Sequence, residues 1–199
     1  MSKEQLRRSM QAARRALSDL ERQRAADELC RQLISSSWYR DSDTLAAYLA
    51  VNGEIDLEPF IDAAHRHGKR LCLPVIAAGP ALRFAVFERD APLYPNRYGI
   101  AEPGGPRVRH ASPRELDLVL APLVAFDSRG HRIGMGAGFY DRTFAFLNER
   151  PQPARPLLIG AAYELQRAPA IEPEPWDVPL SGIATERGIY DLRSEPGAS

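Results

Sequence analysis

A glycine-rich stretch, GHRIGMGAGFYDR at residues 130–142, combines the residue types that bind phosphate. Its three glycines, at every second position in 134–138, would let the backbone approach a bulky anion closely. Arg132 precedes them and offers a planar guanidinium that can hold a phosphate through two hydrogen bonds. Asp141 follows them, and its carboxylate could hold Mg²⁺. The stretch therefore predicts a site for a phosphorylated ligand.

The spacing in this stretch separates it from two common nucleotide-binding loops. No Gly-Lys-Ser or Gly-Lys-Thr follows the glycines, so it is not a Walker A loop. The glycines also lack the G-x-x-G interval of a dinucleotide fingerprint. An ordinary structural interpretation stays open at this point, in which the glycines form a tight turn and Asp141 caps the helix that follows.

Composition excludes several classes of protein. The 199 residues carry 26 basic and 26 acidic side chains, so no basic surplus indicates a nucleic-acid partner. No apolar run approaches a membrane span, and the charged N-terminus lacks a secretory signal, so we expect a cytoplasmic protein without a membrane partner. Cys30 and Cys72 are too few for a disulfide framework and are expected to be small buried residues. Lysine occurs only at Lys3 and Lys69, which makes each of them a candidate for point contact with phosphate.

Periodicity and turn residues predict helices alternating with strands. A helix is expected over Lys3–Leu17, and Ser18 with Glu21 forms a capping box that starts the next one. Further helices are expected over 56–70, with Gly68 as the terminator, and over 140–149. Strands are expected at 45–50, 71–76, 82–88, 116–127, 156–164 and briefly near the C-terminus, and residues 92–113 are expected to be a long loop.

Several of these strands are apolar throughout, which is typical of a sheet covered on both faces. We therefore expect an α/β protein, a single three-layer α/β/α domain over residues 1–199 with a mostly parallel central sheet. Such sheets bind ligands at the carboxyl ends of their strands. The glycine stretch follows the strand expected at 116–127 and precedes a helix, which places it at such an end.

The longer string FDSRGHRIGMGAGFYDR, residues 126–142, closely resembles the signature of the 5-formyltetrahydrofolate cyclo-ligase family. Other segments resemble blocks of that family in the family's order. They are KEQLR, YLAVNGEID, LCLPVI, YGIAEP, IGAAYELQ and EPWDVPLSGIATERGIY. The resemblance therefore covers nearly the whole chain.

This resemblance implies a fold like that of sugar-phosphate isomerases and CoA transferases. It implies an ATP- and Mg²⁺-dependent conversion of 5-formyltetrahydrofolate to 5,10-methenyltetrahydrofolate, with release of ADP and phosphate through a phosphorylated formyl group. The only partners implied are these small molecules, and the expected state is a monomer.

The resemblance also implies roles for particular residues. Arg132 and Tyr140 match catalytic positions, and Asp141 and Asp177 match the Mg²⁺ carboxylates. The ATP contacts implied are Lys3, Arg7, Arg132, Gly134, Gly136, Gly138 and Tyr140. The folate contacts implied are Leu49, Glu54, Met135, Gly136, Ala137, Gly138 and Phe139. Phe139 stands where many members have Tyr, and Ala137 where others have Gly or Lys, so a hydroxyl and a charge are missing here.

Each of these residues has a plainer interpretation when taken alone. Lys3 and Arg7 would be solvated charges on a first helix, and Glu54 beside Asn52 would be a turn residue. Two other functions also stay open: a folate- or nucleotide-binding protein without catalysis, and a relative of the isomerases or transferases that needs no ATP. A shared fold does not by itself decide among them.

Overall fold

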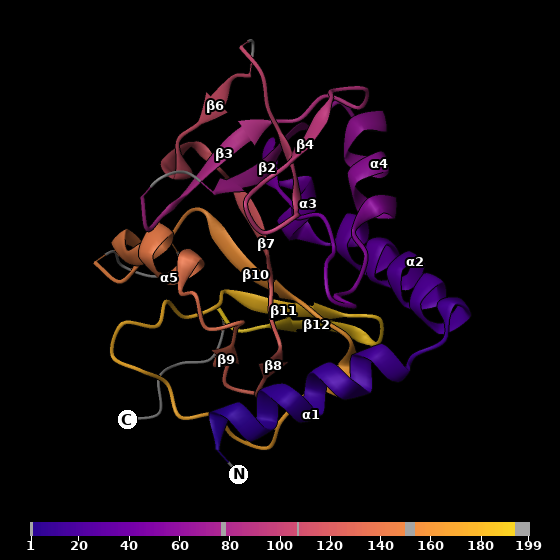
Figure 1. Cartoon of the computed structure of the whole chain (residues 1–199), viewed down its shortest axis with the longest axis vertical. Coiled ribbons are helices and arrows are strands. Elements are labelled where there is room, and N and C mark those ends of the chain that lie inside the picture. The colour runs from indigo at the N-terminus through magenta and orange to yellow at the C-terminus, as the bar shows by residue number, and fades with distance from the viewer. Residues whose placement is uncertain (1, 77–78, 107, 150–153, 194–199) are drawn as a thin grey trace.

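An eight-stranded sheet runs through the middle of the molecule, with helices on both sides (Figure 1). The computed structural model describes residues 2–76, 79–106, 108–149 and 154–193. Across the sheet the strand order is β12-β11-β10-β7-β1-β2-β3-β6. These strands span, in chain order, β1 Thr44–Ala46, β2 Arg70–Ile76, β3 Leu82–Val86, β6 His110–Ala111, β7 Leu118–Pro122, β10 Leu157–Ala161, β11 Gly182–Thr185 and β12 Gly188–Asp191.

The five central strands, from β11 to β2, are parallel, and antiparallel strands complete both ends of the sheet. The predicted α/β class and mostly parallel sheet are therefore confirmed. Two small antiparallel pairs lie outside the main sheet. One joins β4 (Leu93–Pro95) to β5 (Ala101–Pro103), and the other joins β8 (Ala125–Phe126) to β9 (Arg132–Ile133).

The helices begin and end at residues suited to those positions. Helices α1 (Lys3–Ala16) and α2 (Asp19–Ser35) start after Ser2 and Ser18, each with a complete capping box. The others are α3 Ser37–Arg40, α4 Glu58–Arg66 and α5 Phe139–Phe144, with 3₁₀ turns η1 Pro113–Glu115, η2 Ala145–Leu147 and η3 Glu164–Gln166. No helix in the described ranges is both long and apolar enough to cross a membrane.

Side chains of the central strands point alternately to the two faces of the sheet and belong to two separate hydrophobic cores. Leu118 and Leu120 pack on the face covered by α2 and α4, whereas Val119 and Ala121 pack on the face covered by α5. Because side chains of a strand alternate between faces, a wholly apolar strand is needed wherever both faces are covered. A third, smaller cluster joins Leu6 of α1 to Ile133 of β9 and neighbouring apolar residues. Cys72 is buried and Cys30 half-buried, both as free thiols.

Four expectations about element bounds were wrong. The strand expected at 45–50 is only the three-residue β1, and the helix expected at 140–149 is α5 followed by η2. The apolar run 116–127 divides, because its end leaves the sheet as β8 and pairs with β9. The loop expected at 92–113 contains the β4–β5 pair and the edge strand β6. The three glycines therefore follow the β8–β9 hairpin, which lies outside the main sheet, rather than the core strand β7 directly.

Candidate active site

One face of helix α1 supplies side chains to the glycine stretch. Arg7 donates from Nε to the carbonyl of Gly134 at 3.0 Å, and Gln11 Nε2 lies 3.3 Å from Sδ of Met135. Near the start of the helix, Lys3 Nζ pairs with Glu174 Oε1 at 2.6 Å. Residues four apart on a helix share a face, so one helix delivers all three side chains to the same side.

A guanidinium–carboxylate pair lies at the centre of this region. Arg132 donates to Asp141 and to the carbonyl of Val178, and its side chain is only 7% exposed. Asp141 Oδ1 also accepts from the backbone N–H of Val178 at 3.2 Å. The hairpin β8–β9 positions Arg132, and the first turn of α5 positions Asp141. These contacts tie the glycine stretch to the segment that contains Asp177.

Two of the three glycines have backbone conformations that other residues rarely adopt. Gly136 has φ +98° and Gly138 has φ +61°, and Gly138 is the N-cap residue of α5. Gly134 has no such conformation, and a Cβ added there would meet nothing within 4 Å. Gly134 is therefore not required by the local turn, and a side chain there would point into open space.

The carboxylates of Asp141 and Asp177 belong to neighbouring parts of the structure. Asp177 Oδ2 accepts from the backbone N–H of Glu174 at 2.8 Å, and the next residue, Val178, donates to Asp141. No group of three or more His, Cys, Asp or Glu able to hold a metal occurs among the described residues. Mg²⁺ at phosphate sites usually takes one or two carboxylates plus phosphate and water, so this donor set fits it.

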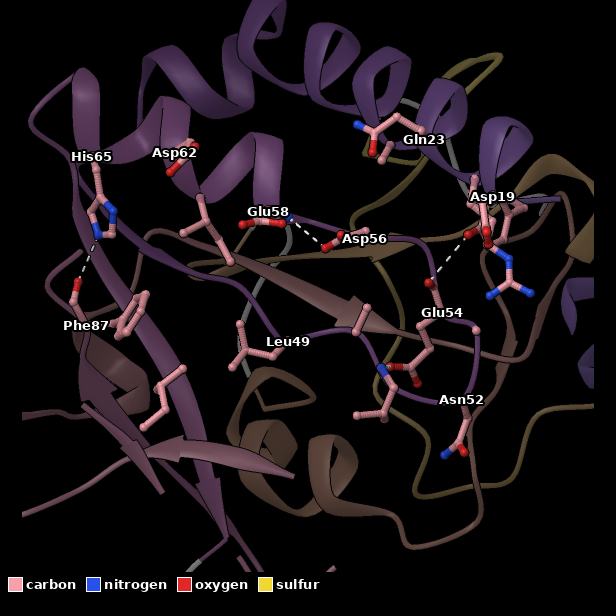
Figure 2. Close-up of a pocket in the computed structure, with 18 of the residues that line it drawn as sticks. Asp19, Gln23, Leu49, Asn52, Glu54, Asp56, Glu58, Asp62, His65 and Phe87 are labelled. Carbon is pink, nitrogen blue, oxygen red and sulfur yellow. Dashed lines mark hydrogen bonds between the residues drawn. The ribbon is translucent and has the colours of Figure 1, made fainter. Parts of the chain in front are cut away.

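The predicted folate contacts Leu49 and Glu54 line a cavity of about 660 Å³ between α2, α4 and the segment after β1. Figure 2 shows Asn52 and Glu54 at one end of this cavity, Leu49 between, and Phe87 with His65 at the other end. Among the residues described, 134–139 do not line it, so the structure does not place all the predicted folate contacts in one cavity.

A tight turn fixes Glu54. Asn52 and Gly53 both have positive φ, at +53° and +74°, which lets the chain reverse between Val51 and Glu54. The turn is closed by the Glu54 N–H donating to the Val51 carbonyl at 3.0 Å, and Val51 N–H returns a bond to Glu54 Oε2 at 3.1 Å. The side chain is 8% exposed. The Glu54 carboxylate is therefore nearly buried and fixed by a hydrogen bond, unlike the solvated side chain of an ordinary turn residue.

Arg14, which was not predicted from the sequence, stabilises this turn through a hydrogen bond to the Asn52 carbonyl. It is fully buried and donates to the carbonyls of Leu123 and Asn52, each at 3.1 Å, while its Nε has no partner among the described residues. The helical spacing of Lys3, Arg7 and Arg14 could have revealed it, because 3, 7 and 14 lie on one face of a helix. No sequence pattern of this kind indicates Glu174, the partner of Lys3.

Burial is the largest influence on the pKa values of Glu54, in the turn, and Tyr140, in α5. Burial raises the pKa of Glu54, while the Val51 N–H and the charge of Arg14 act in the opposite direction. Burial also raises the pKa of Tyr140 well above its usual range, and the Glu54 carboxylate adds to this while Arg132 opposes it. The phenol of Tyr140 is therefore even harder to ionise than that of an exposed tyrosine, which is already neutral at physiological pH.

The structure thus groups the predicted residues in two places. Around the glycine stretch it gathers Lys3, Arg7, Arg132, Gly134, Met135, Gly136, Ala137, Gly138, Phe139, Asp141 and Asp177. In the cavity it places Leu49 and Glu54. Tyr140 lies at the start of α5. Helix α1 contacts both groups, since Arg7 donates to the Gly134 carbonyl and Arg14 to the Asn52 carbonyl.

Comparison with known proteins gives a consistent result. The model of the 5-formyltetrahydrofolate cyclo-ligase family matches residues 1–186. The 5-formyltetrahydrofolate cyclo-ligase of Escherichia coli K12 is 34% identical over 183 residues, which are 89% of this chain and 97% of that protein. The enzyme of the same name from Haemophilus influenzae is 33% identical over 184 residues, covering 91% and 96% of the two chains.

Solved structures of similar fold carry a related name. The NMR structure of Aquifex aeolicus 5,10-methenyltetrahydrofolate synthetase matches with a TM-score of 0.83 and 29% identity, covering 100% of this chain and 97% of the other. A Mycoplasma pneumoniae 5,10-methenyltetrahydrofolate synthetase matches in fold with a TM-score of 0.73 and 23% identity, over 94% and 99% of the chains.

Proposed function

The chain belongs to the 5-formyltetrahydrofolate cyclo-ligase family and is a ligase, and from this premise we propose that it closes 5-formyltetrahydrofolate to 5,10-methenyltetrahydrofolate with ATP and Mg²⁺. One observation supports the proposal most strongly. Helix α1 contacts both the glycine stretch, where Arg7 donates to the Gly134 carbonyl, and the turn before Glu54 in the cavity, where Arg14 donates to the Asn52 carbonyl. A phosphoryl donor and a heterocyclic substrate could therefore bind side by side.

The proposed reaction has two chemical steps. The formyl oxygen attacks the γ-phosphorus of ATP, the bond from that phosphorus to ADP breaks, and the formyl carbon becomes a phosphorylated iminium. N10 then attacks this carbon, the carbon–oxygen bond breaks with its electron pair leaving on phosphate, and N10 loses its proton. Phosphorylation is needed because an amide oxygen is a poor leaving group, and phosphoryl transfer itself asks mainly for positioning and charge.

The proposed phosphate site consists of Arg132, the backbone of 134–138 and the α1 side chains. Arg132 lies almost buried, where a charge is screened less by solvent and acts more strongly on a developing negative charge. Lys3 and Arg7 supply further positive charge from α1. Lys3 contacts Glu174, and Arg7 contacts the Gly134 carbonyl and Glu4; phosphate oxygens could replace these partners.

Asp141 and Asp177 are the proposed magnesium ligands, because each is an oxygen donor and both accept from backbone N–H groups of the segment 174–178. A bound Mg²⁺ would neutralise charge on the phosphates during transfer. Arg132, which already donates to Asp141, would hold that carboxylate in place.

The proposed folate site uses Glu54 and Leu49. A carboxylate suits the edge of a pterin, whose amino and ring N–H groups are donors. Leu49 offers an apolar surface, and the neutral phenol of Tyr140 can donate a hydrogen bond toward the reacting formyl group. Phe139 can pack against the substrate but brings no hydroxyl.

The test is to mix the purified protein with 5-formyltetrahydrofolate, ATP and Mg²⁺ and to follow the near-ultraviolet absorbance of the methenyl product. We expect a rise that requires all three components. A flat trace from folded protein that still binds the folate would instead support a binding protein without catalysis. The proposal includes a monomer acting in the cytoplasm, and light scattering that found a stable dimer would contradict the first of these.

A further inference from the structure

Trp176 is the most exposed large hydrophobic side chain in the described ranges, with 67% of its surface accessible. The other tryptophan, Trp38, is 2% exposed and packs in the core. Tryptophan is highly buried on average, because its large indole ring carries much apolar surface. Within the described residues the Trp176 indole makes no hydrogen bond or ring contact. A large part of this flat ring is therefore open to a ligand.

A closed turn carries Trp176. The backbone N–H of Asp177 donates to the Glu174 carbonyl at 3.0 Å, and the Glu174 N–H donates to Oδ2 of Asp177 at 2.8 Å. Pro175 occupies the second position of this four-residue turn, where its fixed φ suits the turn. Two hydrogen bonds and a proline therefore fix the backbone from which the indole extends.

The same turn is bound on both sides to the proposed phosphate site. Glu174, at its start, pairs with Lys3 of α1 at 2.6 Å. Val178, just after its end, donates its backbone N–H to Asp141 at 3.2 Å. Figure 1 shows the chain between β10 and β11 passing the start of α1. The turn that exposes Trp176 therefore joins two parts of the site proposed to hold the triphosphate.

Resting on the proposed function, we propose that Trp176 stacks against the purine base of ATP and makes the enzyme prefer purine to pyrimidine nucleotides. A triphosphate bound by Arg132 and Lys3 still has a base to place, and neither of these side chains offers it an aromatic surface. The aromatic residues of the glycine stretch, Phe139 and Tyr140, are proposed for the folate. Every base has a π-face that can stack on an aromatic ring, and differences in stacking strength give modest preferences among bases.

Quenching of tryptophan fluorescence by acrylamide tests this stacking, because the chain has 2 tryptophans and Trp38 is buried. We expect ATP with Mg²⁺, without folate, to shield Trp176 and weaken the quenching. Tripolyphosphate with Mg²⁺ has the charges but no base, and it should leave the quenching unchanged. In Trp176→Phe the remaining signal comes from Trp38, and its quenching should be weak with or without ATP.

Calorimetric titration and steady-state kinetics give the second test. In Trp176→Ala we expect the Kd and the KM for ATP to rise about tenfold, the size of effect for losing one base–aromatic stack. The preference for ATP over CTP should also fall in this variant. Trp176→Phe keeps a ring and should retain most of the affinity for ATP, and neither variant should change the Kd for tripolyphosphate.

The matched control is Leu20→Ala, which removes another exposed hydrophobic side chain, in the first turn of α2, and should leave the Kd for ATP unchanged. Three results would overturn the stacking while leaving the cyclo-ligase activity in place: quenching that bound ATP does not weaken, shielding by 5-formyltetrahydrofolate alone, or equal losses of affinity for ATP and tripolyphosphate in Trp176→Ala. Failure of the folded wild type to bind ATP at all would contradict both the stacking and the proposed function.

Discussion

At the scale of single residues, Arg132 has the most demanding position in the phosphate region. It is nearly buried, and it contacts both a carboxylate and a backbone carbonyl. We predict that Arg132→Ala lowers kcat by about a hundredfold or more, since removal of one preorganised charge at a reacting group has effects of this size. Turnover at saturating ATP measures it.

The same substitution also removes structural contacts, so a control is needed. Arg132→Lys keeps the charge but loses the two-pronged geometry, and we expect it to retain more activity than alanine. Circular dichroism and thermal unfolding of both variants separate loss of fold from loss of charge. Near-normal turnover of a folded alanine variant would contradict the proposed role.

Glu54 leads to a prediction about pH. Because burial raises its pKa, the carboxylate becomes protonated at a higher pH than an exposed glutamate would. If the ionised form binds the pterin, kcat/KM for the folate should fall as pH drops through that raised pKa. In Glu54→Gln this acid limb should vanish, and KM for the folate should rise about tenfold or more, the range for losing a charge-assisted hydrogen bond.

The KM for ATP is the internal control for that variant. It should remain near the wild-type value, because Glu54 lies in the cavity and not at the glycine stretch. Equal losses for both substrates would indicate a general disturbance of the site and would count against a specific folate contact.

Not every residue of the site was predictable from sequence. Arg132 and Asp141 stand in one short motif, so their proximity follows from the local chain. Glu174 faces Lys3 across 171 positions, and only the folded chain brings the two together. Arg14 is an intermediate case, because helical spacing indicates its face but not its burial.

At the scale of elements, the glycine loop has a strained backbone at Gly136 and open space at Gly134, and substitutions at the two positions measure the two properties separately. We predict that Gly136→Ala lowers the free energy of unfolding by about 1–2 kcal/mol, because its φ of +98° disfavours any side chain. Its KM for ATP should rise as the loop adjusts. Denaturant unfolding and ATP titration measure the two effects.

Gly134→Ala is the matched control, since it adds the same methyl group where φ is ordinary and nothing lies within 4 Å. Its stability should stay within about 0.5 kcal/mol of wild type, as for most uncrowded surface changes. A rise in its KM for ATP without loss of stability would show that the ligand needs the space. A large loss of stability would refute our description of this position.

Helix α1 and the turn at Glu54 are coupled through Arg14. We predict that Arg14→Lys raises KM for the folate several-fold while leaving KM for ATP unchanged, because a lysine ammonium cannot satisfy two separated carbonyls as a guanidinium does. Steady-state kinetics in both substrates test this. An equal change in both constants would mean that Arg14 serves the fold alone.

The kinds of elements were easier to predict than their bounds. Capping boxes at Ser2 and Ser18 are local and fix where helices begin. The break between β7 and β8 is not local, because both halves of that run are equally apolar and only pairing with β9 separates them. The β4–β5 pair was missed for a similar reason, since all three residues of β4 are exposed and form no apolar pattern.

At the scale of the whole molecule, stability should depend on Asp127, whose side chain is 1% exposed. Burial would raise its pKa, but backbone N–H groups of Ile171, His131 and Arg129, with the His131 ring, outweigh this and hold the pKa below its usual value. The carboxylate thus contributes stability that is present above pH 4 and is lost as pH falls through the lowered pKa.

We therefore predict that Asp127→Asn lowers the free energy of unfolding at neutral pH by about 1–3 kcal/mol, the cost of poorly satisfied buried donors. It should also flatten the dependence of stability on pH below about pH 5. Urea unfolding from pH 7 to pH 3 measures both. A parallel shift, with the acid slope unchanged, would show that Asp127 does not contribute to the acid loss.

The architecture as a whole followed from the sequence more readily than any one contact did. Wholly apolar strands between amphipathic helices require a sheet covered on both faces, and the two cores on either side of β7 meet that requirement. The antiparallel ends of the sheet did not follow, since strand direction at an edge depends on short connections rather than on apolar pattern.

The position of α1 has a consequence for biosynthesis. It is the earliest helix of the described chain to leave the ribosome, yet its partners at Leu123, Gly134 and Glu174 are made 109, 127 and 171 residues later. Until those partners are made, Lys3 and Arg7 lack the contacts that hold them beside the glycine stretch. A chain interrupted before Glu174 would contain most of the sheet but not the contact of Lys3, so the proposed phosphate site is complete only after Glu174 has been made.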